Sequence, residues 1–96
     1  MKPSTALQIH REEVRNIILG HRVLNPRVFG SVLHDKDSEG SDLDILVDPT
    51  PETTLMDIGA IRCELRNLLG VKVEVLTPRS LPLSFRQRVI DEATPI

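Results

Sequence analysis

The chain has 96 residues, a formal net charge of −2 at pH 7, 27% charged residues and 40% hydrophobic residues. These values describe one globular domain spanning residues 1–96 with a modest core, and they argue against a disordered chain. Only two residues are aromatic. Phosphate backbones attract basic surfaces and bases stack on aromatic rings, so the composition disfavours nucleic acid as the primary partner.

Cysteine content and hydropathy indicate the compartment. A single cysteine allows no intramolecular disulfide, which suits a reducing cytoplasm. No apolar run approaches the roughly 18 residues needed to cross a bilayer, and the first residues do not resemble a signal peptide. We therefore expect a cytoplasmic domain without a membrane partner.

The first thirty residues are expected to form one helix and one short strand. Apolar residues at helical spacing predict a helix over residues 5–19. Ser4 or Thr5 can cap its start, and Gly20 can stop it in a left-handed conformation. After a short Asn-Pro link, residues 27–30 (RVFG) read as a strand.

A loop is expected over residues 31–41, followed by a strand over residues 42–48 (DLDILVD). Successive side chains of a strand point to opposite faces. One face of this strand therefore carries aliphatic side chains and the other carries carboxylates. The aliphatic positions are Leu43, Ile45 and Val47; the carboxylates on the other face are Asp42 and Asp44.

The second half predicts a helix over residues 53–69 with Gly70 as its C-cap, a strand over residues 71–76, and a terminal helix within residues 77–93. The resulting order predicts an α/β (α+β) fold, with helices packed on the valine and isoleucine face of a small mixed sheet. Glu74 falls on the opposite face, as Asp42 and Asp44 do.

The acidic stretch from residue 35 to 48 has three interpretations. A calcium loop is disfavoured because the twelfth position of the EF-hand pattern that starts at Asp35 is Leu46, where a bidentate glutamate is needed. A solvated acidic hairpin explains Asp35, Asp37 and Glu39 as exposed connectors. It does not explain two aspartates at alternate positions of an aliphatic strand, because aspartate is depleted in strands and like charges repel.

The third interpretation is a metal–nucleotide site. Two carboxylates on one strand face can converge on Mg²⁺, which also binds water and substrate phosphates. Gly30 lets the backbone approach a phosphate, and Ser31 offers an N–H and a hydroxyl. Glu74 adds a third carboxylate as a metal ligand or general base.

The spacing Gly30-Ser31, ten residues, then Asp42-Leu43-Asp44 resembles the signature of minimal nucleotidyltransferases, the smallest members of the DNA polymerase beta superfamily. Ser41 precedes the first aspartate, as it often does there. Glu74 lies on the later strand, where a third acidic residue is expected. The resemblance covers nearly the whole chain and implies a polymerase-beta-like nucleotidyltransferase fold.

The resemblance implies transfer of AMP from ATP to a hydroxyl group, with two Mg²⁺ ions as cofactors. Asp42, Asp44 and Glu74 would be the catalytic and metal-binding residues, while Gly30, Ser31 and Ser41 would bind the nucleotide. Similar proteins include MntA-like antitoxins of HEPN/MNT toxin–antitoxin systems, which attach AMP to a tyrosine of a HEPN-domain toxin. This chain contains no tyrosine, so a tyrosine acceptor must lie on another protein.

Two departures from the pattern leave alternatives open. His34-Asp35 stands where members often carry Arg-Gly, which would weaken contact with a triphosphate, and Glu74 replaces the commoner aspartate. One alternative is a binding module that neutralises its partner sterically with a weak or inactive site. Another is a nucleotidyltransferase with an RNA or small-molecule acceptor. A weak second face near Cys63 on the helix over residues 53–69 leaves a homo-oligomer open.

Overall fold

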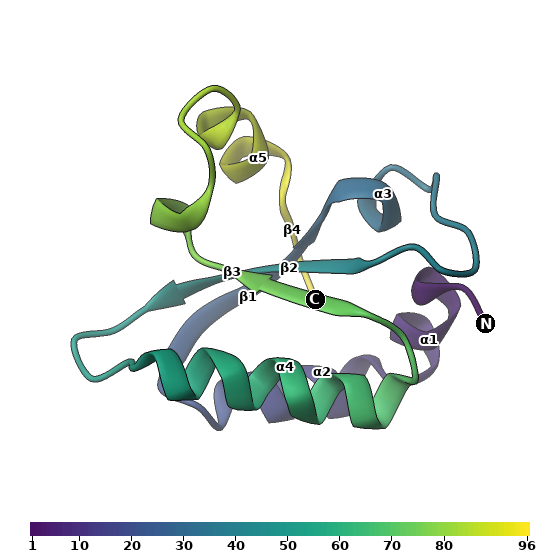
Figure 1. The fold of residues 1–96 in the computed structure, drawn as a ribbon, viewed down its shortest axis with the longest axis horizontal. Helices are drawn as coiled ribbons and strands as arrows, with labels where there is room; N and C mark the ends of the chain where they lie inside the picture. The colour runs from purple at the N-terminus through teal and green to yellow at the C-terminus, as the bar shows by residue number, and fades with distance from the viewer.

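The computed structural model describes residues 1–96 as a four-stranded sheet with helices on both faces (Figure 1). The strand order is β3-β2-β1-β4, in which β1 is antiparallel to β2 and β4, and β2 is parallel to β3. The predicted mixed sheet is confirmed. No helix has the length and apolar character needed to cross a membrane. The elements are α1 (Pro3–Ile9), α2 (Arg11–Leu19), β1 (Val23–Phe29), α3 (Gly30–Leu33), β2 (Leu43–Pro49), α4 (Leu55–Leu69), β3 (Val73–Leu76), the 3-10 turn η1 (Pro78–Ser80), α5 (Arg86–Glu92) and β4 (Thr94–Pro95).

Helices α1, α2 and α4 cover one face of the sheet, below the strands in Figure 1. The aliphatic face predicted from the alternation of β2 and β3 is buried against them and forms the larger core cluster. Each fully buried aliphatic side chain contributes about 1.5–3 kcal/mol, so this layer provides most of the stabilisation. Its strand residues include Leu43, Ile45, Val47, Val73 and Val75.

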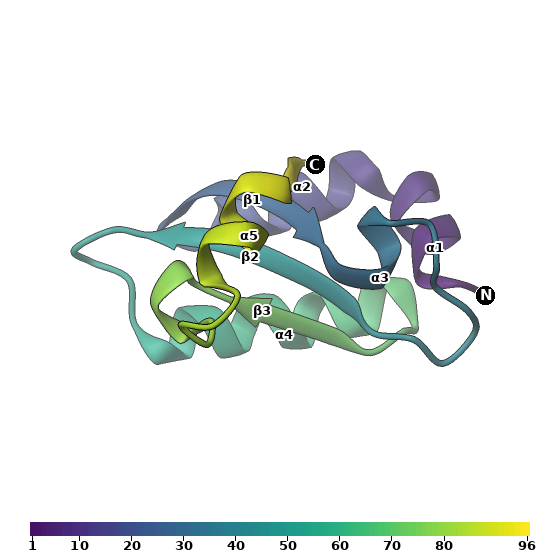
Figure 2. The ribbon, with the colours of Figure 1, turned by 90° about the horizontal axis from the view of Figure 1, so that it is seen from above.

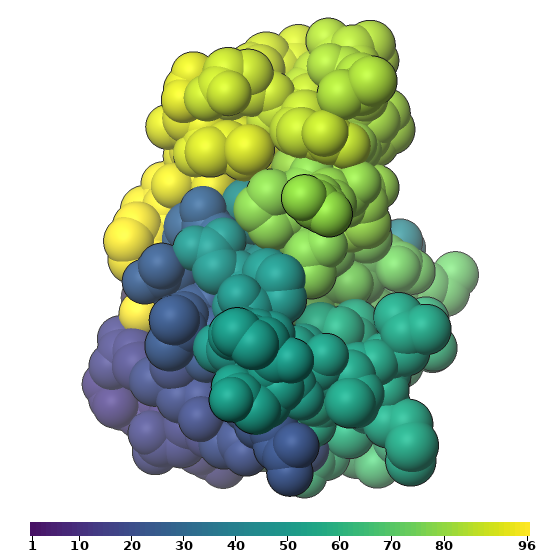
Figure 3. All heavy atoms as spheres, turned by 90° about the vertical axis from the view of Figure 1, so that its left-hand side faces the viewer, coloured from purple at the N-terminus to yellow at the C-terminus, as the bar shows by residue number.

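Helix α5 lies over the opposite face of the sheet, as Figure 2 shows from above. A second, smaller cluster joins it there to the strands, through Phe29, Leu46, Leu81 and Val89. Figure 3 shows the C-terminal segment, in yellow and green, as a raised lobe above the body of the protein. Leu46, which packs in this cluster, and Asp44 lie on the same face by strand parity. Helix α5 therefore lies next to the acidic residues.

Helix α4 is capped at both of its ends. At its start, Thr54 and Asp57 form a reciprocal capping box, in which each side chain accepts a hydrogen bond from the other residue's backbone N–H. At its end, Gly70 adopts φ +68°, the left-handed C-cap that was predicted.

The prediction of a single helix over residues 5–19 is wrong. The chain forms α1 and α2, with a break at His10, whose φ of −110° and ψ of 22° are not helical. The His10 ring lies 2.7 Å from Glu13 Oε1 in the first turn of α2. Neither Ser4 nor Thr5 provides a side-chain cap for α1, which starts with Pro3 at its first turn.

The segment between α2 and β1 also differs from expectation. Gly20 has φ −76° and is not left-handed, whereas Arg22 has φ +58°. Strand β1 begins before the Asn-Pro pair and continues through it, with a register shift between Leu24 and Arg27. A bulge accommodates Pro26 because proline cannot donate to a regular ladder.

Two short elements lie outside the predicted order. The loop expected over residues 31–41 begins with the single turn of α3, and residues 94–95 form β4 along the free edge of β1. These elements are too short to produce a periodic pattern in the sequence.

Candidate active site

The three predicted carboxylates come together at the start of β2 and β3. Asp44 is paired with Glu74 across the parallel ladder, and Asp42 directly precedes β2 on the same strand face. On its other side, Asp44 is opposite Phe29, the last residue of β1. Asp44 therefore occupies the centre of the acidic face, next to the segment that carries Gly30.

The electrostatic environment of Asp44 is unfavourable for a charge. Burial first, and then the negative charges of Asp42 and Glu74, together raise the pKa of Asp44 to about 6. No ion pair of the protein includes any of these three residues. The site thus concentrates negative charge without an internal cation to balance it.

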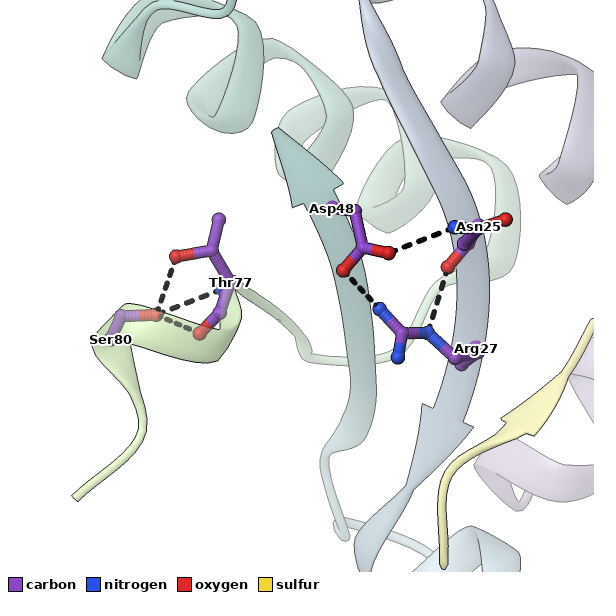
Figure 4. Close-up of polar contacts among 5 residues, drawn as sticks. All are labelled: Asn25, Arg27, Asp48, Thr77 and Ser80. Atoms are coloured by element: carbon purple, nitrogen blue, oxygen red, sulfur yellow. Dashed lines mark hydrogen bonds and ion pairs between the residues drawn. The ribbon is translucent and has the colours of Figure 1, made fainter. Parts of the chain in front are cut away.

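Asp48 provides a comparison on the same face of the same strand. Its carboxylate lies 2.5 Å from the Arg27 guanidinium and accepts a hydrogen bond from the Asn25 amide at 2.9 Å (Figure 4). Asp48 is therefore neutralised within the fold, whereas Asp44 is not. The same close-up shows Thr77 and Ser80 closing the η1 turn with their own side chains.

Glycine is required at position 30 both by the backbone conformation and by the nearby Asp44 side chain. It has φ +73°, and a Cβ at this position would overlap the Asp44 Oδ2 and lie 3.2 Å from Cγ. Since only glycine combines a left-handed backbone with such a close approach, Gly30 lets Asp44 lie directly against the chain. Ser31 follows, half-buried in α3.

Ser41 has a local role in the loop. Its hydroxyl accepts a hydrogen bond from the Ser38 backbone N–H at 2.9 Å, and its N–H donates to the Ser38 carbonyl at 3.0 Å. These contacts close a turn immediately before Asp42. A nucleotide contact by Ser41 stays a prediction.

Asp37 is not the exposed connector that was expected. Its side chain is buried, and its Oδ2 accepts the Ser4 backbone N–H at 2.8 Å, within the first turn of α1. That backbone hydrogen bond lowers the pKa of Asp37. Sequence reasoning missed this role because the acceptor and the helix are 33 residues apart. Asp35 and Glu39 are exposed, as predicted.

The departure at His34-Asp35 has a visible structural consequence. Asp35 has φ +56°, so this position adopts the left-handed backbone for which glycine is preferred, and aspartate tolerates it. The His34 Nε2 lies 3.1 Å from Glu92 Oε2 on α5. The side chain at the position where similar proteins often carry arginine is therefore paired with an acid.

A pocket of about 370 Å³ lies beside the acidic residues, between α3 and α5. Of the arginines near the C-terminus, only Arg88 lines it. Arg86 instead donates to the Leu81 carbonyl at 2.8 Å and the Arg79 carbonyl at 2.9 Å. No local pattern in the sequence distinguishes Arg79, Arg86 and Arg88, and only the fold separates them. The pocket is lined by Phe29, Gly30, His34, Phe85, Arg88, Val89 and Glu92.

The donor set fits Mg²⁺ as a partly protein-bound ion. No three acidic, histidine or cysteine side chains form a complete metal-ligand cluster on their own. Mg²⁺ typically takes one or two carboxylates and fills its remaining positions with water and substrate phosphate. Asp42 and Asp44, on one strand face and without protein cations, suit that role, and Glu74 as a third ligand stays a prediction.

Comparison with known proteins agrees with this architecture. The family model described as "Polymerase beta, Nucleotidyltransferase" matches residues 12–96. A relative from Methanocaldococcus jannaschii, named "Putative protein adenylyltransferase", is 33% identical over 86 residues, covering 90% of this chain and 92% of the relative.

Two solved structures are also similar. The "Structure of putative minimal nucleotidyltransferase" has a TM-score of 0.86 and 36% identity, over 97% of this chain and 95% of that one. A toxin–antitoxin crystal structure with AMP-PNP has a TM-score of 0.73 and 17% identity, over 88% and 69%, and at that identity it supports the fold alone. The match over residues 12–96 and the 33% identical relative show that this chain belongs to the polymerase-beta-type nucleotidyltransferase family.

Proposed function

We propose that the protein is a Mg²⁺-dependent adenylyltransferase that moves AMP from ATP to a hydroxyl of a partner protein. The observation that carries this proposal is Asp44: it lies half-buried between Asp42 and Glu74, against Gly30, and no protein cation balances it. Such a carboxylate is suited to divalent-cation and phosphate chemistry. The relative named for protein adenylyltransfer supports AMP as the transferred group.

In this mechanism Asp42 and Asp44 would hold Mg²⁺, which when bound neutralises phosphate charge during transfer. Gly30 leaves the backbone free to approach the phosphates. Glu74 accepts the proton of the acceptor hydroxyl. A bond forms between the acceptor oxygen and the α-phosphorus, the bond from that phosphorus to the bridging oxygen breaks, and pyrophosphate leaves.

The acceptor we propose is a tyrosine of a helical HEPN-domain toxin, so that the protein acts as an antitoxin. The chain contains no tyrosine. Its three acidic residues, Asp42, Asp44 and Glu74, are partly exposed, so a second protein can reach them. A solved toxin–antitoxin structure shares this fold, and the proposal takes its type of partner from that structure.

The test is an incubation of the protein with ATP, Mg²⁺ and the candidate HEPN-domain protein, followed by intact mass measurement. We expect the partner to gain one or more AMP units. Asp44→Asn should abolish the gain. Asp48→Asn is the matched control, because it removes a carboxylate from the same strand face at a position already neutralised by Arg27.

A second function is favoured by one observation, the pairing of His34 with Glu92, which leaves this site without the family's free arginine at that position. The protein could then neutralise the toxin by binding alone. Full neutralisation by Asp42→Asn/Asp44→Asn, with no mass change of the partner in the presence of the wild type, would establish this alternative and exclude the enzymatic one.

A further inference from the structure

The pocket between α3 and α5 reaches the C-terminal helix and adjoins the acidic residues at Gly30, although Asp42, Asp44 and Glu74 do not line it. Gly30 belongs to both: it lines the pocket, and its α-carbon lies against the Asp44 carboxylate. A volume of about 370 Å³ is within the range of small-ligand pockets. A nucleotide with its reacting phosphorus at Asp44 can therefore extend its remaining phosphates into this space.

Helix α5 presents one face to the pocket. Arg88, Val89 and Glu92 of the helix line it together with Phe85 at the N-cap, and Phe85, Arg88 and Glu92 follow one another at three- and four-residue spacing, that of neighbours on a helix face. Val89 is buried in the second hydrophobic cluster together with Phe29 and so fixes the orientation of this face. The backbone position of Arg88 is thereby set by packing, and its exposed side chain lies along the pocket.

The charges in the pocket are distributed unequally. His34 and Glu92 pair with each other at 3.1 Å. Arg88 takes part in no ion pair, and its Cζ lies 6.0 Å from the centre of the Phe85 ring. Arg88 is thus the permanently charged cation that the pocket has free for an anion. A guanidinium can bind a phosphate with two parallel hydrogen bonds.

We infer that Arg88, on α5, binds the phosphate tail of the nucleotide. It supplies the cation that His34, which is paired with Glu92, does not supply. The inference rests on the proposed function and names a residue that positions its substrate. In this chain the phosphate contact would thus come from the C-terminal helix, whereas similar proteins often carry an arginine at the position of His34, three residues after Ser31.

The test measures binding of AMP-PNP with Mg²⁺, and separately of adenosine, by calorimetry on the full chain. Arg88→Gln should weaken AMP-PNP binding by about tenfold or more, the usual effect of losing a charge-assisted hydrogen bond, and leave adenosine binding unchanged. Arg88→Lys, which keeps the charge, should lose less. Arg62→Gln is the matched control, since Arg62 is an exposed arginine on α4, on the other side of the sheet.

Each outcome has a defined meaning. Unchanged AMP-PNP affinity in Arg88→Gln, with wild type that binds nucleotide and transfers AMP, overturns the inference and leaves the proposed function intact. Equal weakening of AMP-PNP and adenosine also overturns it, because the contact would then be to the nucleoside. If the wild type binds no AMP-PNP, both the inference and the proposed function fail. Equal melting temperatures of the variants exclude unfolding as the cause.

Discussion

At the scale of single residues, Asp44 differs from Asp48 only in its neighbours, although both lie on one strand face. Asp48 is paired with Arg27, whereas Asp44 is half-buried beside two further acids, and its pKa is raised to about 6. A carboxyl group whose pKa is higher in the folded state favours folding when protonated. Its contribution is present below its unfolded value of about 3.9 and is lost as the pH rises through about 6.

Asp44→Asn should therefore stabilise the metal-free protein at pH 8, where the wild type carries the buried charge. We expect a gain of about 1 kcal/mol, less than the full linkage because the carboxylate is partly solvated. The gain should shrink to about a third at pH 4.5, which is below the folded pKa of about 6 but still above the unfolded value. Thermal unfolding of both proteins in a chelator at the two pH values measures this difference. A gain of equal size at both pH values would show that Asp44 does not titrate in this window.

Gly30 provides a second prediction, with Gly70 as its control. The two glycines have φ of +73° and +68°, but a Cβ on Gly70 meets nothing within 4 Å, whereas one on Gly30 overlaps the Asp44 carboxylate. Alanine should cost about 1–2 kcal/mol of stability at either position because of the left-handed backbone.

AMP transfer should fall only in Gly30→Ala, because only there does the new methyl group displace Asp44. Unfolding free energies and initial transfer rates of the two variants, measured side by side, test this separation. Equal activity of the two variants would show that the close approach of Gly30 to Asp44 is not needed for the reaction.

At the scale of elements, the loop before β2 stabilises the first helix. Asp37 is 7% exposed and accepts the Ser4 N–H, so a loop side chain satisfies a free donor at the start of α1. Because its pKa is lowered, its contribution is present above the unfolded value of about 3.9 and is lost as the pH falls through the lower folded value.

Asp37→Ala should lower the free energy of unfolding by about 1–2 kcal/mol at pH 7, the usual cost of a lost cap. The difference from wild type should decrease below about pH 4. Glu39→Ala is the control, since Glu39 is an exposed acid of the same loop and its ion pair with the N-terminus is also exposed. Denaturant unfolding measures the effect, and equal stability of Asp37→Ala and Glu39→Ala would contradict the capping role.

Elements with a strong local pattern were predictable from the sequence. The alternation of β2 and β3 and the apolar stripe of α4, ended by Gly70, each define an element and its buried face without reference to the rest of the chain. The acidic face followed from strand parity alone. The pairing of Asp44 with Glu74 then required only that β2 and β3 be neighbours.

Features that depend on distant contacts were not predictable. The break at His10, the bulge in β1 and the short strand β4 depend on how the segments pack, and none of them changes the local apolar pattern. The role of Asp37 requires a contact across 33 residues. Likewise, three arginines looked equivalent until the fold placed Arg88 in the pocket and bound Arg86 to carbonyl oxygens.

At the scale of the whole molecule, one face of the sheet carries most of the hydrophobic core and the other carries the candidate active site. One face is buried under α1, α2 and α4, while the other holds the acidic residues beside the small cluster under α5. The domain brings its own carboxylates and a pocket for a small ligand, but it contains no tyrosine. A tyrosine acceptor for the proposed reaction would therefore have to come from a second protein.

The most direct test of the proposed reaction follows the phosphorus atoms of ATP. The protein, Mg²⁺ and the candidate HEPN-domain partner are incubated with ATP labelled at either the α- or the γ-phosphorus, and label on the partner is measured. Attack at the α-phosphorus predicts that α-label appears on the partner, that γ-label leaves with pyrophosphate, and that Asp44→Asn transfers neither. Transfer of γ-label, or of no label from either ATP while the toxin is still neutralised, would contradict an adenylyltransferase.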